Sequence, residues 1–247
     1  MKKTKIALAI AMALSTTLTV ANAAPVTFFG EDLNGLGDPN VLLAFPNSNA
    51  AQASLLANLT GVGTENFEGL STGTAPPIPL LFPGAGTATL NGGVGIQSGN
   101  DNSGRYPISG SNYYYAGTND LNITFDQPVA AFGFYGVDIG DYGATLTLSL
   151  TDTNNVVSML NVPLTVGSGG DTSGSVIYFG FYDLTRQYNS IAFTNSGGGD
   201  NFAFDDMTIG SLQQVTPTIP EPETYAMMLA GLGLLGLAAR RRKQKAV

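Results

Sequence analysis

The sequence of 247 residues contains no cysteine, no histidine and no tryptophan. Without cysteine, the chain cannot form a disulfide framework or offer a thiol nucleophile. Without histidine, Ser-His-Asp and Cys-His catalysis and a histidine-ligated zinc or iron site are excluded. Any chemistry of this protein must therefore come mainly from carboxylates, hydroxyls and amides.

Basic side chains are also scarce between the two ends of the chain. Residues 24–219 contain sixteen acidic side chains against two basic ones, Arg105 and Arg186, which gives a formal charge of −14. This charge makes nucleic acid and an anionic membrane surface poor partners. It favours cations, cationic surfaces or neutral sugars.

The first 23 residues have the organisation of a secretory signal peptide. Lys2, Lys3 and Lys5 precede an uncharged run over residues 6–20, and small residues follow up to Ala23. We predict a signal helix that the Sec-type export machinery recognises, with cleavage after Ala23.

The C-terminal segment, residues 216–247, contains three parts in order. Pro220 and Pro222 flank Glu221 in an acidic tag, which should be extended because proline donates no backbone hydrogen bond and disfavours helix before it. Residues 225–239 carry no charge. As a helix they would span about 22 Å, against a hydrocarbon core of about 30 Å. We therefore predict a short, transient transmembrane helix, with an ordinary tail anchor or a buried core helix as the alternative.

Residues 240–247 form a basic tail that includes three consecutive arginines. Such a tail should stay on the cytoplasmic side of the membrane, with everything before Pro220 outside. The tag Pro220-Glu221-Pro222, the glycine-rich apolar run and the arginine cluster resemble the PEP-CTERM sorting signal, which exported bacterial proteins present to exosortase. The resemblance implies processing by exosortase, a place in the cell envelope or outside the cell, and an association with exopolysaccharide, biofilm or floc formation.

Residues 24–215 have the composition of a β domain. Residues 144–151 alternate between apolar and polar side chains, and Asn154-Asn155 marks a hairpin turn into 156–160. Many short strands with frequent turns predict an antiparallel β-sandwich, and their spacing favours a jelly-roll-like arrangement. Further strands are predicted at 26–29, 64–67, 87–90, 94–97, 112–116, 121–125, 129–137, 175–181, 190–194 and 201–209.

One segment breaks this pattern. Residues 48–59 are rich in alanine and leucine, with Asn47 or Ser48 available as N-cap and Gly61 placed to end a helix. We predict a short helix that covers an open end of the sandwich. The proline-rich residues 74–86 are predicted to form a stiff extended loop.

The adjacent Asp205 and Asp206 are the first candidate site residues. Phe202 and Phe204 fall on one strand face, whereas the apolar residues after the two acids fall on the other, so a bulge is predicted. A bend that carries two carboxylates could hold a hard cation. The alternative is a turn in which the carboxylates accept backbone N–H bonds.

This last strand resembles that of many PEP-CTERM and carbohydrate-binding jelly rolls. In the same pattern an early strand carries Phe-Glu-Gly-Leu, which is present here at residues 67–70. The resemblance implies that the early and last strands pair and that Glu68, Asp205 and Asp206 form a structural calcium (Ca2+) site.

Three consecutive tyrosines, Tyr113, Tyr114 and Tyr115, must alternate in direction along a strand, so at least one is predicted to be exposed. An exposed tyrosine could stack on a sugar ring, but packing at an edge of the sandwich is the alternative. Arg105 is interpreted as an internal ion-pair partner, and residues 100–104 as a turn.

These features together predict a non-enzymatic, exported structural or adhesive protein of the cell envelope or extracellular matrix that binds polysaccharide. The alternative is a glycan hydrolase or lyase that uses a pair of carboxylates.

Overall fold

The computed structural model describes residues 24–117, 120–140, 145–166, 172–195 and 200–216, together with residue 232. The predicted signal peptide, the tag Pro220-Glu221-Pro222, the basic tail and all but one residue of the predicted transmembrane helix lie outside the described residues. Within the described ranges, no helix is long and apolar enough to cross a membrane.

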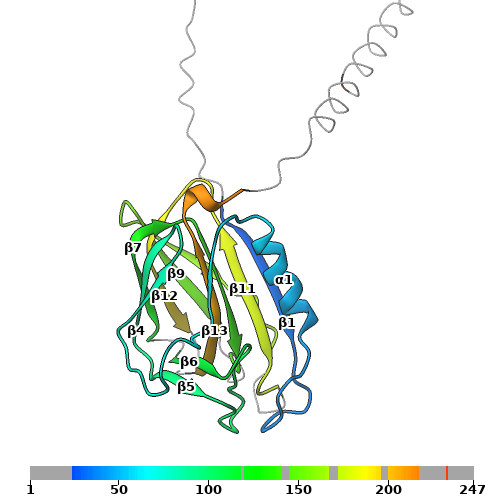
Figure 1. Ribbon diagram of the computed structural model, residues 1–247. Helices are drawn as coiled ribbons and strands as arrows, with labels where there is room; N and C mark the ends of the chain where they lie inside the picture. The colour runs from blue at the N-terminus through cyan, green and yellow to red at the C-terminus, as the bar shows by residue number, and fades with distance from the viewer. Residues whose placement is uncertain are drawn as a thin grey trace, which may run out of the picture.

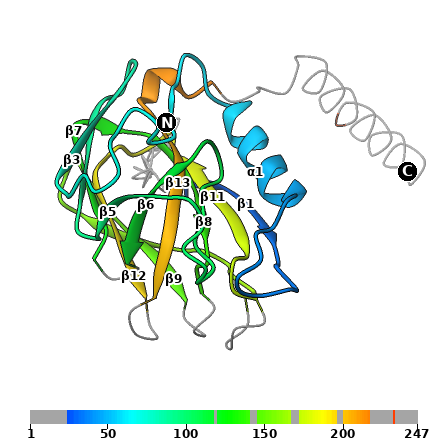
Figure 2. The ribbon, with the colours of Figure 1, turned by 60° about the horizontal axis from the view of Figure 1, so that its bottom comes forward.

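The domain consists of two antiparallel sheets that face each other (Figures 1 and 2). The prediction of an antiparallel β-sandwich is confirmed. The first sheet has the order β1 (Val26–Asp32), β11 (Val176–Tyr182), β8 (Ala131–Val137), β13 (Asn201–Gly210), β6 (Asn112–Gly117) and β5 (Gly95–Ser98), with β2 (Thr64–Glu65) paired to β13. The second sheet has the order β10 (Val157–Asn161), β9 (Leu146–Asp152), β12 (Tyr188–Asn195), β7 (Asn122–Val129), β4 (Gly86–Asn91) and β3 (Ile78–Phe82).

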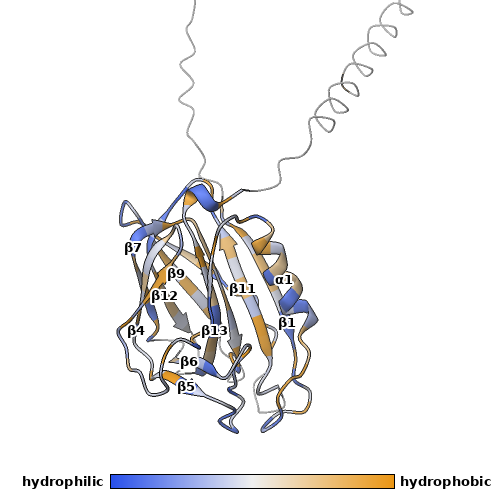
Figure 3. Ribbon diagram, viewed as in Figure 1, coloured by the Kyte–Doolittle hydropathy of each residue, from blue (hydrophilic) through white to orange (hydrophobic). Residues whose placement is uncertain are grey.

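The burial of each strand follows from its position. In β9, buried and half-buried residues alternate, because one face lies on the core and the other faces outward. In β8 and β11 every residue is buried, because these strands have the sandwich core on one face and helix α1 (Pro46–Leu56) on the other. Figure 3 shows hydrophobic stretches along strands such as β9 and β11.

Aromatic rings fill the space between the sheets. Phe134 stacks on Phe204 with ring centroids 5.2 Å apart, and the Phe193 ring meets Phe134 edge-on at 5.1 Å. Such pairs add stabilisation beyond the area that they bury. Residues 132–136 and 178–182 are all buried, and their phenylalanines contribute to this core.

Two strand predictions require correction. The predicted loop 74–86 contains β3, an edge strand in which Pro79 and Leu81 are exposed and their neighbours are buried. The predicted strand 129–137 matches β8 from Ala131 onward, but Val129 ends β7 in the other sheet, because the chain crosses between the sheets at Ala130, whose N–H donates to the Gly210 carbonyl.

The helix also differs from its prediction. Helix α1 runs over Pro46–Leu56, starts after Phe45 and has no side-chain N-cap bond. It lies along β1 and β11 on the outer face of the first sheet rather than over an open end (Figure 1). Ser48 is fully buried and donates from its Oγ to Asp32 Oδ2 at 2.8 Å, so this side chain fixes the helix to β1 instead of capping it.

The sandwich has two ends, which the site descriptions below use. The terminal end is where β1 begins and β13 ends, and where the 3₁₀ helix η1 (Leu212–Gln214) lies. It includes the hairpin 153–156 and the loop 183–187. The distal end is the opposite one, with the loops 33–45, 138–140 and 172–175.

Candidate functional site

The adjacent carboxylates Asp205 and Asp206 lie in a bulge of β13. The strand register shifts between Asp205 and Thr208, and Asp206 has φ 47°, so the predicted bulge is confirmed. Asp205 Oδ2 accepts from the backbone N–H groups of Ile108 at 2.8 Å and Ser109 at 3.2 Å. Asp206 Oδ1 accepts from Ser109 Oγ at 2.7 Å. Both acids therefore hold the loop that precedes β6.

Burial changes the acidity of this pair. Asp205 is fully buried, and desolvation, together with the neighbouring Asp206 charge, raises its pKa to about 8 even though three backbone N–H groups act in the opposite direction. Burial also raises the pKa of Asp206. A fully buried Asp205 cannot contact a glycan, so the pair does not present two accessible carboxylates.

Glu68 lies in the turn after β2 and holds the same loop. Its Oε1 accepts from the backbone N–H groups of Ser111 at 2.7 Å and Asn112 at 2.6 Å. Strand β2 pairs with β13, as predicted for the early and last strands. The three predicted carboxylates thus act on one loop, although in the described ranges no group of three or more acids is arranged to hold a metal ion. The contacts of Asp205 and Glu68 match the alternative in which carboxylates accept backbone N–H bonds, whereas Asp206 accepts from the Ser109 hydroxyl.

The three tyrosines of β6 are less accessible than predicted. Tyr113 is 1% exposed and Tyr114 is fully buried, and the Tyr114 hydroxyl donates to the Gly92 carbonyl. Tyr115 is half-buried, and the Arg105 guanidinium lies 5.2 Å from its ring centroid. The alternative of packing at the sandwich therefore holds for Tyr113 and Tyr114, whose rings are not open to a sugar.

Arg105 lies near the distal end of the sandwich and forms two ion pairs. Its Nε lies 2.7 Å from Asp101 Oδ2, and one terminal nitrogen lies 3.1 Å from Asp138 Oδ2. Asp101 Oδ1 also accepts from the backbone N–H groups of Ser103 and Arg105, so residues 100–104 form the predicted turn. The interpretation of Arg105 as an internal ion-pair partner is confirmed.

The Asp138 carboxylate extends this arrangement into a network. It is 3% exposed, and its Oδ1 accepts from Ser173 Oγ and the Gly174 N–H, each at 2.9 Å. Ser173 Oγ also lies 2.7 Å from Asp38 Oδ1. The network joins three loops of the distal end, so the role of Arg105 is structural.

Arg186, the second arginine, lies in the loop 183–187 at the terminal end. Asp183 holds this loop: its Oδ1 accepts from the backbone N–H groups of Thr185 at 2.7 Å and Arg186 at 3.0 Å, and its Oδ2 accepts from Tyr188 Oη at 2.7 Å. Among the described residues, the Arg186 guanidinium forms no ion pair, and its buried Nε has no hydrogen-bond partner.

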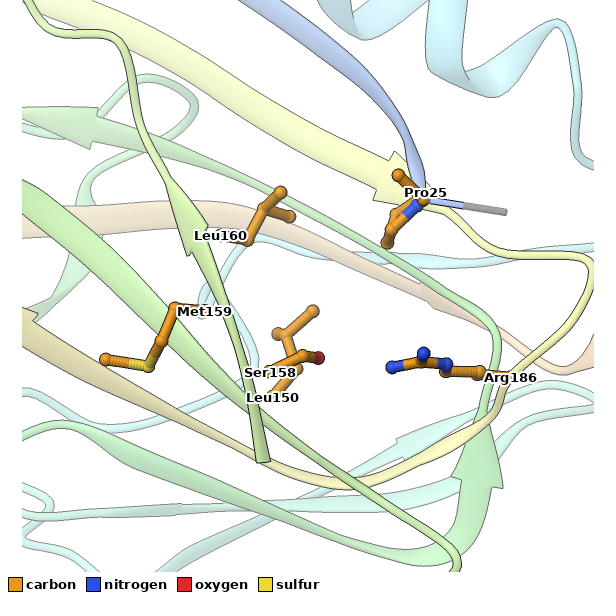
Figure 4. A pocket seen from close by; sticks show the side chains of 7 residues that line it. Pro25, Leu150, Ser158, Met159, Leu160 and Arg186 are labelled. Atoms are coloured by element: carbon orange, nitrogen blue, oxygen red, sulfur yellow. The ribbon is translucent and has the colours of Figure 1, made fainter. Parts of the chain in front are cut away.

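Two adjacent hollows share Arg186. The larger, of about 280 Å³, lies between edge strand β10 and the start of β1 and is lined mainly by Pro25, Leu150 and Leu160, with Ser158. In Figure 4 the guanidinium of Arg186 and the hydroxyl of Ser158 point toward each other across this hollow. The smaller, of about 160 Å³, is lined by polar residues: Asp152, Thr153, Asn154, Thr185 and Gln187. We call the two hollows together the Arg186 pocket.

The sequence did not point to this pocket. Both arginines stand out in the sequence because basic residues are scarce. The residues around Arg186, however, do not reveal that Asp152 and Asp183 accept backbone N–H bonds instead of pairing with its guanidinium. That distinction depends on contacts between separate loops.

A family model for the PEP-CTERM protein-sorting motif matches residues 218–243. The chain carries a PEP-CTERM sorting motif. The resemblance seen in the tag, the apolar run and the arginine cluster is therefore confirmed. The PEP-CTERM motif implies an exported protein that is transiently anchored in the membrane and processed by exosortase.

Two solved structures resemble the sandwich at low sequence identity. The K2 cleaved adhesin domain of Lys-gingipain is 16% identical over 60% of this chain and 97% of that chain, with a TM-score of 0.40. The CBM22-1 xylan-binding domain of Xyn10C from Paenibacillus barcinonensis is 13% identical over 64% of this chain and 96% of that chain, with a TM-score of 0.33. Likenesses this distant assign no ligand to the chain. No curated protein sequence matches it.

Proposed function

We propose that this PEP-CTERM protein is a structural or adhesive component of the extracellular matrix and binds polysaccharide there. The observation that carries the proposal is the order of its parts: a sorting motif at residues 218–243 directly follows the last elements of a β-sandwich. The motif directs sorting, and the sandwich is the part that remains outside the membrane.

The sorting step has a direct test. If exosortase processes the chain, the exported protein lacks the basic tail 240–247 and the apolar run before it. Intact-protein mass spectrometry of the envelope and extracellular fractions measures this. Retention of the tail in the mature protein would overturn the processing step.

Binding without turnover distinguishes the proposed role from a carboxylate-dependent hydrolase or lyase. The pair Asp205-Asp206 does not support catalysis, because Asp205 is fully buried and both acids hold the loop before β6. A glycan array with the exported protein, combined with a reducing-sugar release assay on each glycan bound, tests the role. We expect binding with no release of reducing ends; release would favour the enzyme, and no binding would remove the polysaccharide-binding role.

A structural calcium ion at Glu68, Asp205 and Asp206 stays a prediction. The three carboxylates converge on one loop, which supports it, but each of them already accepts hydrogen bonds from that loop. Bound calcium would raise the melting temperature at millimolar concentration, and EDTA would lower it. If neither reagent changes the melting temperature, the prediction of a structural calcium ion is wrong.

A further inference from the structure

The Arg186 pocket contains a cation whose charge is not used within the fold. The sandwich has many carboxylates, yet in the described ranges only Arg105 is paired with them. The Arg186 Nε is buried, and no described residue accepts a hydrogen bond from it. A ligand oxygen cannot reach this buried Nε, but the guanidinium lines the larger hollow and faces Ser158 across it (Figure 4), so a ligand there would contact its terminal nitrogens.

The backbone of the loop that carries Arg186 is held before any ligand arrives. Asp183, which is 2% exposed, binds the backbone of Thr185 and Arg186 and the hydroxyl of Tyr188. Tyr188 is itself fully buried in the core. A site on such a held loop loses little conformational entropy on binding.

The chemistry of the two hollows indicates the kind of ligand. The larger hollow offers an apolar wall of Pro25, Leu150 and Leu160. The smaller one offers hydroxyl and amide side chains such as Asn154 and Gln187, beside the buried Asp152, whose Oδ1 accepts two backbone N–H bonds. A sugar ring has C–H faces that suit an apolar wall and hydroxyls that suit amides. The guanidinium between the hollows matches a carboxylate, which it can bind through two parallel hydrogen bonds.

We propose that the Arg186 pocket binds a uronate, a sugar residue that carries a carboxylate, within an otherwise weakly charged polysaccharide. The proposal rests on the polysaccharide-binding function above and names the sugar that this site selects. The ligand carries sparse charges because sixteen acidic side chains in residues 24–219 repel a densely anionic chain.

The experiment uses the exported protein and isothermal titration with three probes. The first is an oligosaccharide with one glucuronate, the second is the same oligosaccharide with its carboxylate reduced to an alcohol, and the third is hexanoate. Loss of a charge-assisted hydrogen bond predicts that the reduced oligosaccharide binds at least about tenfold more weakly. Hexanoate should bind more weakly than the glucuronate oligosaccharide, because it lacks the hydroxyls.

The matched variants are R186Q and L43E. Each makes the net charge more negative by one, but Leu43 lies at the distal end and is 92% exposed. R186Q should bind the glucuronate oligosaccharide at least about tenfold more weakly and no longer distinguish it from the reduced form, whereas L43E should bind it as the unaltered protein does.

The possible failures are distinguishable. Equal affinity for the two oligosaccharides, unchanged affinity in R186Q, or equal binding of hexanoate would overturn the uronate site while leaving polysaccharide binding intact. Absence of binding to every saccharide on the array would remove the proposed function itself, and the uronate site with it.

Discussion

The two arginines of the sandwich lie toward opposite ends of it and in opposite surroundings. Arg105 is paired with Asp101 and Asp138 in a network that joins loops of the distal end. Arg186, at the terminal end, lines a pocket, and the nearby Asp183 binds backbone groups of its loop. An arginine in a strongly acidic domain is therefore not necessarily paired, since the carboxylates around it can be fully occupied by N–H and O–H donors.

Removing Arg105 should have the largest effect on stability. In R105A the buried Asp138 carboxylate loses its cation, and removal of one partner of a buried ion pair costs roughly 3 kcal/mol. Denaturant unfolding followed by tyrosine fluorescence measures the change. A loss below about 0.5 kcal/mol, the range of ordinary surface substitutions, would show that the network does not hold the distal end.

Removing Asp183 should have the next largest effect. D183A leaves the N–H groups of Thr185 and Arg186 and the buried Tyr188 hydroxyl without their acceptor, which predicts a loss of about 2 kcal/mol. Y188F is the control, because it removes only the hydroxyl and should cost about 1 kcal/mol. Equal losses in the two variants would mean that Asp183 does not organise the Arg186 loop.

The third prediction concerns Asp205, a buried carboxylate that, unlike Asp138, has no arginine partner among the described residues. The unfolded chain releases the Asp205 proton near the usual pKa of 3.8, whereas the folded chain keeps it up to about 8. The folded state therefore binds more protons between these values, so stability falls as pH rises from 4 to 8, by at most about 1.4 kcal/mol per pH unit.

Unfolding midpoints in guanidinium chloride at pH 5, 6, 7 and 8 measure this dependence. D205N cannot titrate at this position and should show a much flatter profile. A midpoint that rises over this range, or an unchanged profile in D205N, would contradict the raised pKa of Asp205.

The smallest effect on stability is expected for Arg186. R186Q removes no ion pair among the described residues and relieves a buried nitrogen without a partner, so its stability should stay within about 0.5 kcal/mol of the unaltered protein. Thermal and denaturant unfolding beside R105A check this. A loss as large as that of R105A would place Arg186 in the structure of the fold rather than in a binding site.

The sequence predicted the parts of the fold that depend on local pattern. The alternation in residues 144–151 marked β9, and the shift of apolar register at Asp205-Asp206 marked the bulge. Strand β3 was missed because its prolines suggested a loop, although Pro79 is tolerated in an edge strand that needs no N–H there. Ser48 was misread as a helix cap because its partner, Asp32, comes from another element.

The candidate site residues also divide into those that a local sequence pattern reveals and those that depend on contacts between loops. Three acids could be selected from local sequence: Asp205 and Asp206 are adjacent, and Glu68 lies in the Phe-Glu-Gly-Leu motif at residues 67–70. In the structure all three accept hydrogen bonds from the loop before β6. The difference between Arg105 and Arg186 depends on how several loops meet in space, and no local pattern around either arginine expresses it.

The difference between the two arginines can be measured within one molecule. The folded, exported protein is treated with phenylglyoxal, which modifies accessible and unpaired guanidinium groups, and the modified residues are located by peptide mass spectrometry. We expect Arg186 to react first and the glucuronate oligosaccharide to protect it. We expect Arg105 to react only after unfolding. Reaction of Arg105 as fast as Arg186, or no protection of Arg186 by the oligosaccharide, would contradict this expectation.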